Sequence, residues 1–66
     1  EEPNRLLLLR GERMYEESTS DARQAIDRAV MEFERALKRK DNSEIERARE
    51  KLEQFLNDME FGSGLN

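Results

Sequence analysis

The most regular pattern of apolar residues lies between Ser20 and Lys40. Apolar side chains recur there every three or four positions, which is the period of one face of an α-helix. They are Ala22, Ala25, Ile26, Ala29, Val30, Phe33, Ala36 and Leu37. Basic residues crowd the last turn, where the helix dipole favours cations. We therefore expect a helix over residues 21–40, with an apolar stripe wide enough to contact two neighbouring helices.

A second regular pattern predicts a helix over residues 44–60. Its apolar positions also keep spacings of three and four, and they are Ile45, Ala48, Leu52, Phe55, Leu56 and Met59. Ser43 and Glu46 have the spacing of a capping box, so we expect Ser43 to cap the start of this helix. Gly62 is placed to end the helix as a C-terminal cap.

The segment 5–18 predicts a first helix that is apolar on more than one side. One face carries Leu7, Leu8, Gly11, Met14 and Tyr15. Leu6 and Leu9 point elsewhere, because successive side chains turn by roughly 100° around a helix. Pro3 suits a first helical turn, and Asn4 is a possible cap.

Gly11 lies in the middle of this predicted helix, where it costs about 1 kcal/mol relative to alanine. Two interpretations stay open. Gly11 is either a tolerated weak point or a place where the backbone of a neighbouring helix approaches closely.

Two breaks separate the three predicted helices. Residues 18–21 are all good N-caps, and Asp21 with Gln24 has the spacing of a capping-box variant. Asp41 and Asn42 predict a tight turn, since both tolerate left-handed backbone conformations. A short turn makes its two helices antiparallel neighbours. We expect an all-α, antiparallel three-helix bundle over residues 1–61 and a flexible tail over 62–66. The breaks argue against the alternative, a continuous coiled coil.

Composition limits the function classes. A chain of 66 residues allows one small domain. The net charge of −4 argues against nucleic acid and anionic membrane surfaces as partners, because both attract basic proteins. No apolar run is long enough to span a bilayer. With no cysteine there is no disulfide framework, and we expect a cytoplasmic protein.

The residue inventory offers no catalytic, cofactor-binding or metal site. The chain has no histidine, cysteine or tryptophan, which removes the commonest acid–base catalyst, the thiol nucleophile and the zinc ligands. The many carboxylates lie opposite the apolar stripes, so we interpret them as solvated. Phe33, Phe55 and Tyr15 are expected where the helices meet, and the alternative for them is a peptide-binding groove. We expect a protein that is not an enzyme and uses no cofactor.

The order of residues in the second and third predicted helices resembles a known pattern. An isoleucine early in one helix is followed by an alanine–leucine pair, a charged turn with aspartate, an isoleucine that opens the next helix and a later leucine. These are Ile26, Ala36, Leu37, Asp41, Ile45 and Leu52. The pattern is similar to the C-terminal helical lid of the seventy-kilodalton heat-shock chaperones of the bacterial DnaK type. Residues 6–18 resemble the end of the long lid helix that precedes it.

The resemblance implies a lid subdomain that closes over unfolded peptide during an ATP-driven cycle, with the ATPase domain elsewhere in the parent chain. The implied partners are the rest of that chaperone and its unfolded clients, in protein folding and the stress response. The alternative is an unrelated helical interaction or self-assembly module. In both cases Leu6 and Leu9 are the possible contact surface, because clustered exposed leucines usually mark one. We expect a monomer or a weak homodimer.

Overall fold

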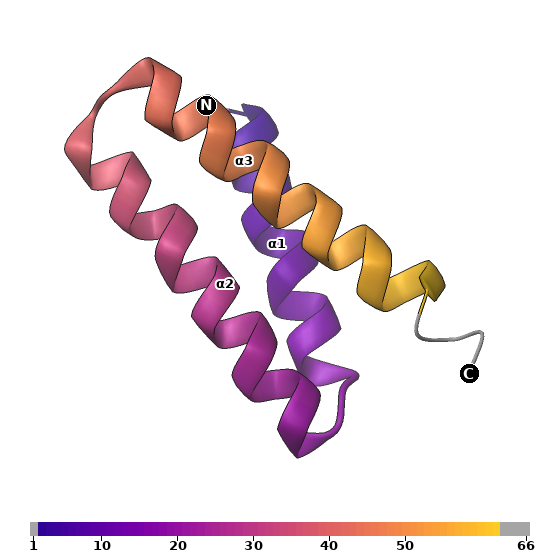
Figure 1. The fold of residues 1–66 in the computed structure, drawn as a ribbon. Coiled ribbons are helices and arrows are strands. Elements are labelled where there is room, and N and C mark those ends of the chain that lie inside the picture. Colours follow the sequence, from indigo (N-terminus) through magenta and orange to yellow (C-terminus); the bar gives the residue numbers. More distant parts are fainter. Residues whose placement is uncertain (1, 63–66) are drawn as a thin grey trace.

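The computed structural model describes residues 2–62, which form three α-helices and a short π-helix (Figure 1). Their bounds are α1 (Glu2–Glu16), α2 (Ser20–Arg39), α3 (Asn42–Asn57) and η1 (Asp58–Gly62). No strand occurs among residues 2–62, and each helix packs against the other two. The predicted all-α three-helix bundle is therefore confirmed. Each helix begins slightly earlier in the chain than its apolar pattern predicts.

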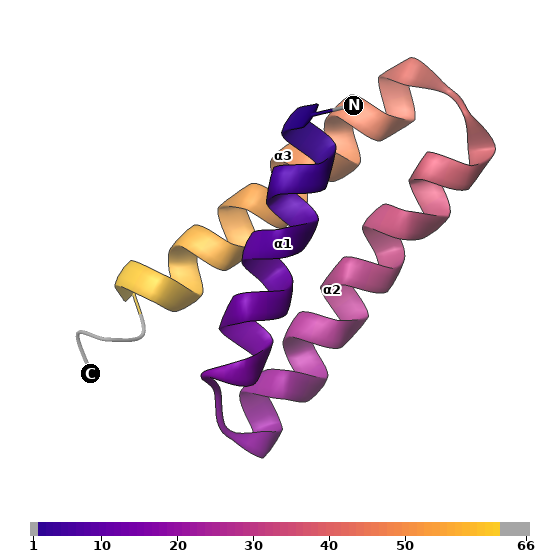
Figure 2. The same ribbon diagram turned by 180° about the vertical axis from the view of Figure 1, so that it is seen from behind.

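The three helices run up, down and up along an elongated molecule of 37 × 18 × 18 Å. α1 and α2 lie side by side as an antiparallel hairpin, and α3 returns along α2 and crosses α1 (Figures 1 and 2). The start of α1 and the α2–α3 turn lie at the same end of the bundle. The C-terminal end of α3 and η1 diverge from the other end of the α1–α2 hairpin.

The core forms where the three apolar stripes meet. Ile26 and Phe33 of α2, with Leu52 and Leu56 of α3, are almost completely buried. α1 contributes its predicted face through Leu7 and Met14, which are also buried. Residues that pack around this core while half-buried are Leu8, Ala29, Val30, Leu37, Ile45, Ala48, Phe55 and Met59.

Tyr15 departs from the prediction that it lies where the helices meet. Its side chain is 41% exposed, and the guanidinium of Arg23 lies 5.4 Å from the centre of its ring. The same Arg23 donates hydrogen bonds to the carbonyl oxygens of Tyr15 and Glu16, at 2.9 and 3.1 Å. These carbonyls belong to the last turn of α1, where the N–H groups of the helix run out, and the Tyr15 carbonyl also accepts a hydrogen bond from the backbone N–H of Ser18, at 3.2 Å. Tyr15 is thus part of the contact that ends α1.

Gly11 allows a close approach of two helices. It is buried in α1, and a Cβ atom added to it would lie 3.0 Å from Cγ2 of Val30 in α2. That distance is shorter than ordinary van der Waals contact, so the missing side chain lets α1 and α2 pack closely. Of the two interpretations of Gly11, the structure supports close packing, but the neighbouring atoms belong to the side chains of Val30 and Leu56 and not to the predicted helix backbone.

The starts of α1 and α2 differ from the predicted caps. α1 already includes Pro3 in its first turn, so Asn4 lies inside the helix and does not cap it. The residue before α2 is Thr19, whose side chain makes no capping hydrogen bond. Asp21, predicted to begin a capping box, lies within the first turn instead. At this position its carboxylate interacts favourably with the positive end of the helix dipole.

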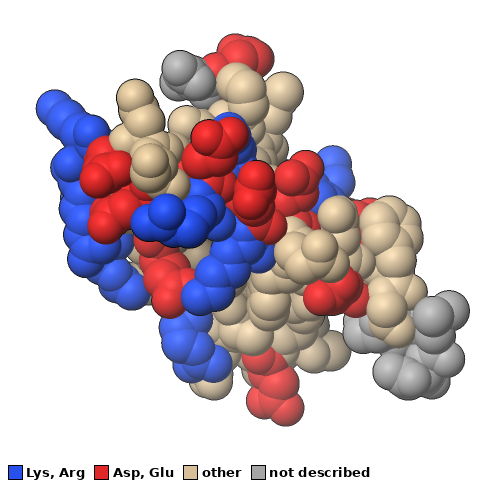
Figure 3. Space-filling view, turned by 45° about the horizontal axis from the view of Figure 1, so that its top comes forward, with Lys and Arg blue, Asp and Glu red and all other residues tan. Residues whose placement is uncertain are grey.

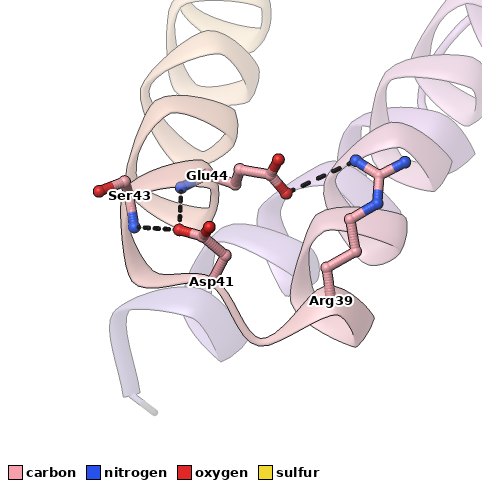
Figure 4. Close-up of polar contacts among 4 residues, drawn as sticks. All are labelled: Arg39, Asp41, Ser43 and Glu44. Carbon is pink, nitrogen blue, oxygen red and sulfur yellow. Dashed lines mark hydrogen bonds and ion pairs between the residues drawn. The ribbon is translucent and has the colours of Figure 1, made fainter.

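The α2–α3 turn corrects two further predictions (Figure 4). The left-handed residue is Lys40, with φ of 59°, and neither Asp41 nor Asn42 has positive φ. Asp41 is the N-cap of α3, and its carboxylate accepts hydrogen bonds from the backbone N–H groups of Ser43 and Glu44, at 3.0 and 3.2 Å. Ser43 is therefore not the cap, because the helix begins before it. The Nη1 atom of Arg39 lies 3.6 Å from Oε1 of Glu44 and adds a charge contact across the turn.

The C-terminal end of the bundle is a π-helical turn, and Gly62 does not form the predicted left-handed cap. α3 passes directly into η1, with Asp58 in right-handed helical conformation. Gly62 is the last residue of η1 and does not have positive φ. The predicted flexible tail lies, apart from Gly62, outside the described residues.

Candidate interaction surface

The outer side of α1 carries the two leucines that are predicted from the sequence to form a contact surface. Leu6 is 54% exposed and Leu9 is 47% exposed, whereas Leu7 between them is only 7% exposed. A rotation of roughly 100° per residue explains this alternation. The predicted exposure of the pair is confirmed, and binding of a partner to it stays a prediction.

Leu6 and Leu9 border two different grooves of the bundle. Leu6 lines a groove between α1 and α3, and Leu9 lines a groove between α1 and α2. Residues three apart are neighbours on a helix surface, so the two side chains lie next to each other on α1. They therefore form a ridge between two hollows.

The α1–α2 groove is lined partly by apolar residues and has a volume of about 310 Å³. Its apolar lining comes from Leu8 and Leu9 of α1 and from Ile26 and Val30 of α2. Gly11 also lines this groove. Its missing side chain allows α1 and α2 to pack closely there.

Three carboxylates line the rim of the α1–α2 groove: Glu12 of α1, and Asp27 and Glu34 of α2. All three residues are exposed. Asp27 and Glu34 are seven residues apart and so lie on the same side of α2. Sequence reasoning counted them only as part of a solvated face. The spacing of Asp27 and Glu34 around Val30 indicates that they share one side of α2. That Glu12 lies in the same groove depends on how α1 packs.

The α2–α3 groove, also of about 310 Å³, has three alanines in its lining. Ala25, Ala29 and Ala48 line it together with Phe55. Phe33 belongs to its floor but is itself only 1% exposed, which makes Phe33 primarily a core residue. The rim carries both basic and acidic side chains, which are those of Arg28, Glu32 and Lys51. Lys51 Nζ lies 3.2 Å from Glu32 Oε1, so these two charges offset each other.

The α1–α3 groove is bordered by paired charges. Arg10 of α1 reaches Glu60 of η1, with 2.6 Å between Nη2 and Oε1. Arg49 of α3 pairs with Glu46 one turn away, at 3.4 Å. Charges of both signs are likewise interspersed on the face of the molecule that Figure 3 shows. On this face, Lys and Arg side chains gather along the left edge, with acidic side chains beside them.

No three acidic side chains among residues 2–62 lie close enough together to hold a metal ion. None of the described helices has the length and apolar character needed to cross a bilayer.

Comparison with known proteins identifies no relative. No protein-family model, curated protein or solved structure matches the chain.

Proposed function

We propose that this chain is the helical lid subdomain of a seventy-kilodalton heat-shock chaperone, which closes over unfolded peptide and performs no catalysis itself. The observation that carries the proposal is the position in the structure of the residues on which the resemblance rests. Ile26, Ala36 and Leu52 are buried in the α2–α3 hairpin, and Asp41 caps α3. The resemblance therefore coincides with the residues that hold the hairpin together.

A lid of this kind acts as a rigid cover. The hairpin has a continuous core, so it can move as one body about a hinge outside the described residues. In this proposal the ridge of Leu6 and Leu9 contacts the rest of the chaperone. Closure slows the escape of a bound peptide, and the ATPase domain elsewhere in the parent chain drives the cycle. The protein acts in the cytoplasm.

The test begins with the complete coding sequence around this segment. We expect it to encode an ATPase domain and a β-rich peptide-binding domain upstream. Deletion of residues 1–66 from that parent should then increase the dissociation rate of a fluorescent unfolded peptide, measured by anisotropy in the ADP-bound state. ATP hydrolysis without peptide should change little, because in this proposal hydrolysis takes place in the separate ATPase domain.

A matched control uses the parent chain with Met31→Ala, which alters an exposed residue of α2 and should leave peptide dissociation unchanged. A parent gene without the two upstream domains contradicts the proposal. So does a deletion that leaves the dissociation rate unchanged.

The alternative proposal is a helical module that assembles with itself. The exposed ridge of Leu6 and Leu9 favours it, because neighbouring exposed leucines often mark a protein contact. Sedimentation over a range of concentrations separates the two proposals. A tight dimer supports the assembly module, whereas a monomer or weak dimer fits the lid.

A further inference from the structure

The α1–α2 groove combines exposed apolar surface with negative charge. Leu8, Leu9 and Val30 present aliphatic side chains to it, and Tyr15 adds an aromatic ring at one end. Leu9 is 47% exposed and Tyr15 is 41% exposed, although both are large side chains. Covering them would remove apolar surface from water, which favours binding.

The charge on the rim of this groove is not neutralised within the described chain. No ion pair among residues 2–62 involves Glu12, Asp27 or Glu34. The one basic residue in the groove, Arg5, is held by Glu2, with 2.6 Å between Nη2 and Oε2. The groove therefore presents three carboxylates without an ion-pair partner, since the guanidinium of Arg23, over the ring of Tyr15, is bound to the carbonyl oxygens of Tyr15 and Glu16.

The other two grooves differ in this respect. In the α2–α3 groove Glu32 is paired with Lys51, which leaves Arg28 as the excess charge. In the α1–α3 groove both basic residues, Arg10 and Arg49, already have acidic partners, and Glu53 is the one carboxylate of that groove without an ion pair among residues 2–62. The α1–α2 groove thus differs from its neighbours in carrying three unpaired carboxylates beside its apolar lining, whereas the α1–α3 groove carries one.

We propose that the α1–α2 groove binds a basic amphipathic helix of a partner protein. The apolar face of that helix would cover Leu8, Leu9 and Val30, and its Lys and Arg side chains would reach Glu12, Asp27 and Glu34. An amphipathic helix laid in an apolar groove is a common mode of recognition. The acidic rim repels phosphate groups, so a protein segment fits better than nucleic acid or an anionic lipid surface. This inference does not depend on the chaperone proposal.

The volume of the groove is consistent with such an occupant. At about 310 Å³ it lies at the lower end of the range for ligand pockets. A site of this size accepts a few side chains from a helix that lies across it. Exposed charge pairs contribute specificity and association rate more than affinity, so binding should be moderate and sensitive to salt.

The test uses the whole chain and a model helical peptide of leucine and lysine at amphipathic spacing. Titration of the peptide into ¹⁵N-labelled protein should shift the amide signals of Leu8, Leu9, Asp27 and Val30. A peptide in which glutamate replaces every lysine is the control and should produce no such shifts. Raising the salt concentration should weaken binding of the lysine peptide.

Two variants with the same change in net charge distinguish the effect of the groove carboxylates from that of the net charge of the protein. The first combines Glu12→Gln, Asp27→Asn and Glu34→Gln, and should bind the peptide about tenfold more weakly, because three exposed charge contacts are lost. The second variant makes the same change in net charge at three residues outside the α1–α2 groove: Glu16→Gln, Glu50→Gln and Glu53→Gln. It should retain affinity within about twofold, since only screened long-range attraction is reduced. All six positions are exposed, and circular dichroism verifies that both variants are folded.

Four results would overturn the proposal. The first is an absence of amide shifts at peptide concentrations up to about 1 mM, the limit of weak specific binding. The second is a set of shifts centred on Ala29 and Ala48 of the α2–α3 groove. The third is equal weakening by both triple variants. The fourth is concentration-dependent self-association through the same amides without peptide, which would assign the groove to a second copy of the chain.

Discussion

Arg10 of α1 and Glu60 of η1 are fifty positions apart in the chain, yet their side chains meet at 2.6 Å. The contact connects the first helix to the π-helical turn that ends the bundle. The Arg10 side chain is 22% exposed and that of Glu60 is 40% exposed, so water screens the pair only in part. The two side chains bridge α1 and η1, although no Cα atom of η1 lies within 8 Å of one in α1.

Removing this ion pair should loosen η1 without unfolding the bundle. We expect Arg10→Ala to increase amide hydrogen exchange at Glu60 and Phe61, while exchange in the middle of α2 stays unchanged. The loss in global stability should be about 1 kcal/mol or less, because partly exposed ion pairs contribute little. Arg49→Ala is the control, since Arg49 pairs locally with Glu46. Equal protection of η1 in Arg10→Ala and the wild type would show that the contact does not hold it.

Asp41 should matter more than Ser43 for the stability of α3. Asp41→Ala removes the acceptor of two backbone N–H groups at the start of the helix and should cost about 1 kcal/mol. Ser43→Ala should change stability by less than about 0.5 kcal/mol, as expected of an exposed substitution away from a cap. Thermal unfolding followed by circular dichroism measures both. A larger loss for Ser43→Ala than for Asp41→Ala would favour the capping box predicted from sequence.

The effect of Gly11→Ala should depend on its neighbour Val30. In a helix the change gains about 1 kcal/mol of propensity, but crowding a packed interface typically costs about 1–3 kcal/mol. The added Cβ would lie 3.0 Å from Cγ2 of Val30, a stiff β-branched side chain, so we expect Gly11→Ala to destabilise the wild type.

In a Val30→Ala background the same Gly11→Ala change should be stabilising, because the crowding atom is gone. Chemical denaturation of the four proteins in this double-mutant cycle measures the change of sign. If Gly11→Ala has the same effect in both backgrounds, the two helices do not pack at this point as described.

The ridge of Leu6 and Leu9 should govern any self-association. We expect the isolated chain to be a monomer or a weak, concentration-dependent dimer. Leu6→Glu combined with Leu9→Glu should abolish the dimer while leaving the helical circular dichroism and the melting temperature close to those of the wild type, because both side chains are exposed. Sedimentation over a range of concentrations provides the measurement.

The matched control replaces an apolar residue from the same part of α1. Leu7→Glu should unfold the bundle, because Leu7 is 7% exposed and a buried charge without a partner is costly. If the Leu6 and Leu9 double variant unfolds instead, those side chains have a role in the core.

The amino-acid sequence by itself determined the number of helices and the faces that they bury. Periodic apolar residues, such as Ile26 and Phe33 in α2 or Leu52 and Leu56 in α3, mark one side of a helix, and the hydrophobic effect requires that side to be covered whatever the details of packing. The rotation of roughly 100° per residue likewise explains why Leu6 and Leu9 are exposed. Helix ends were predicted less well, because several good caps follow one another. The left-handed turn at Lys40 selects Asp41 among them.

Only the tertiary structure decided which residues of different helices meet. The rotation of each helix about its axis, and the closeness that Gly11 allows, bring Glu12 of α1 to the same groove as Asp27 and Glu34 of α2. Likewise, the contact of Arg10 with Glu60 arises because α3 crosses α1 before η1 begins. Such pairings depend on the mutual orientation of helices, which many weak packing contacts set together, and no local pattern in the chain encodes that orientation.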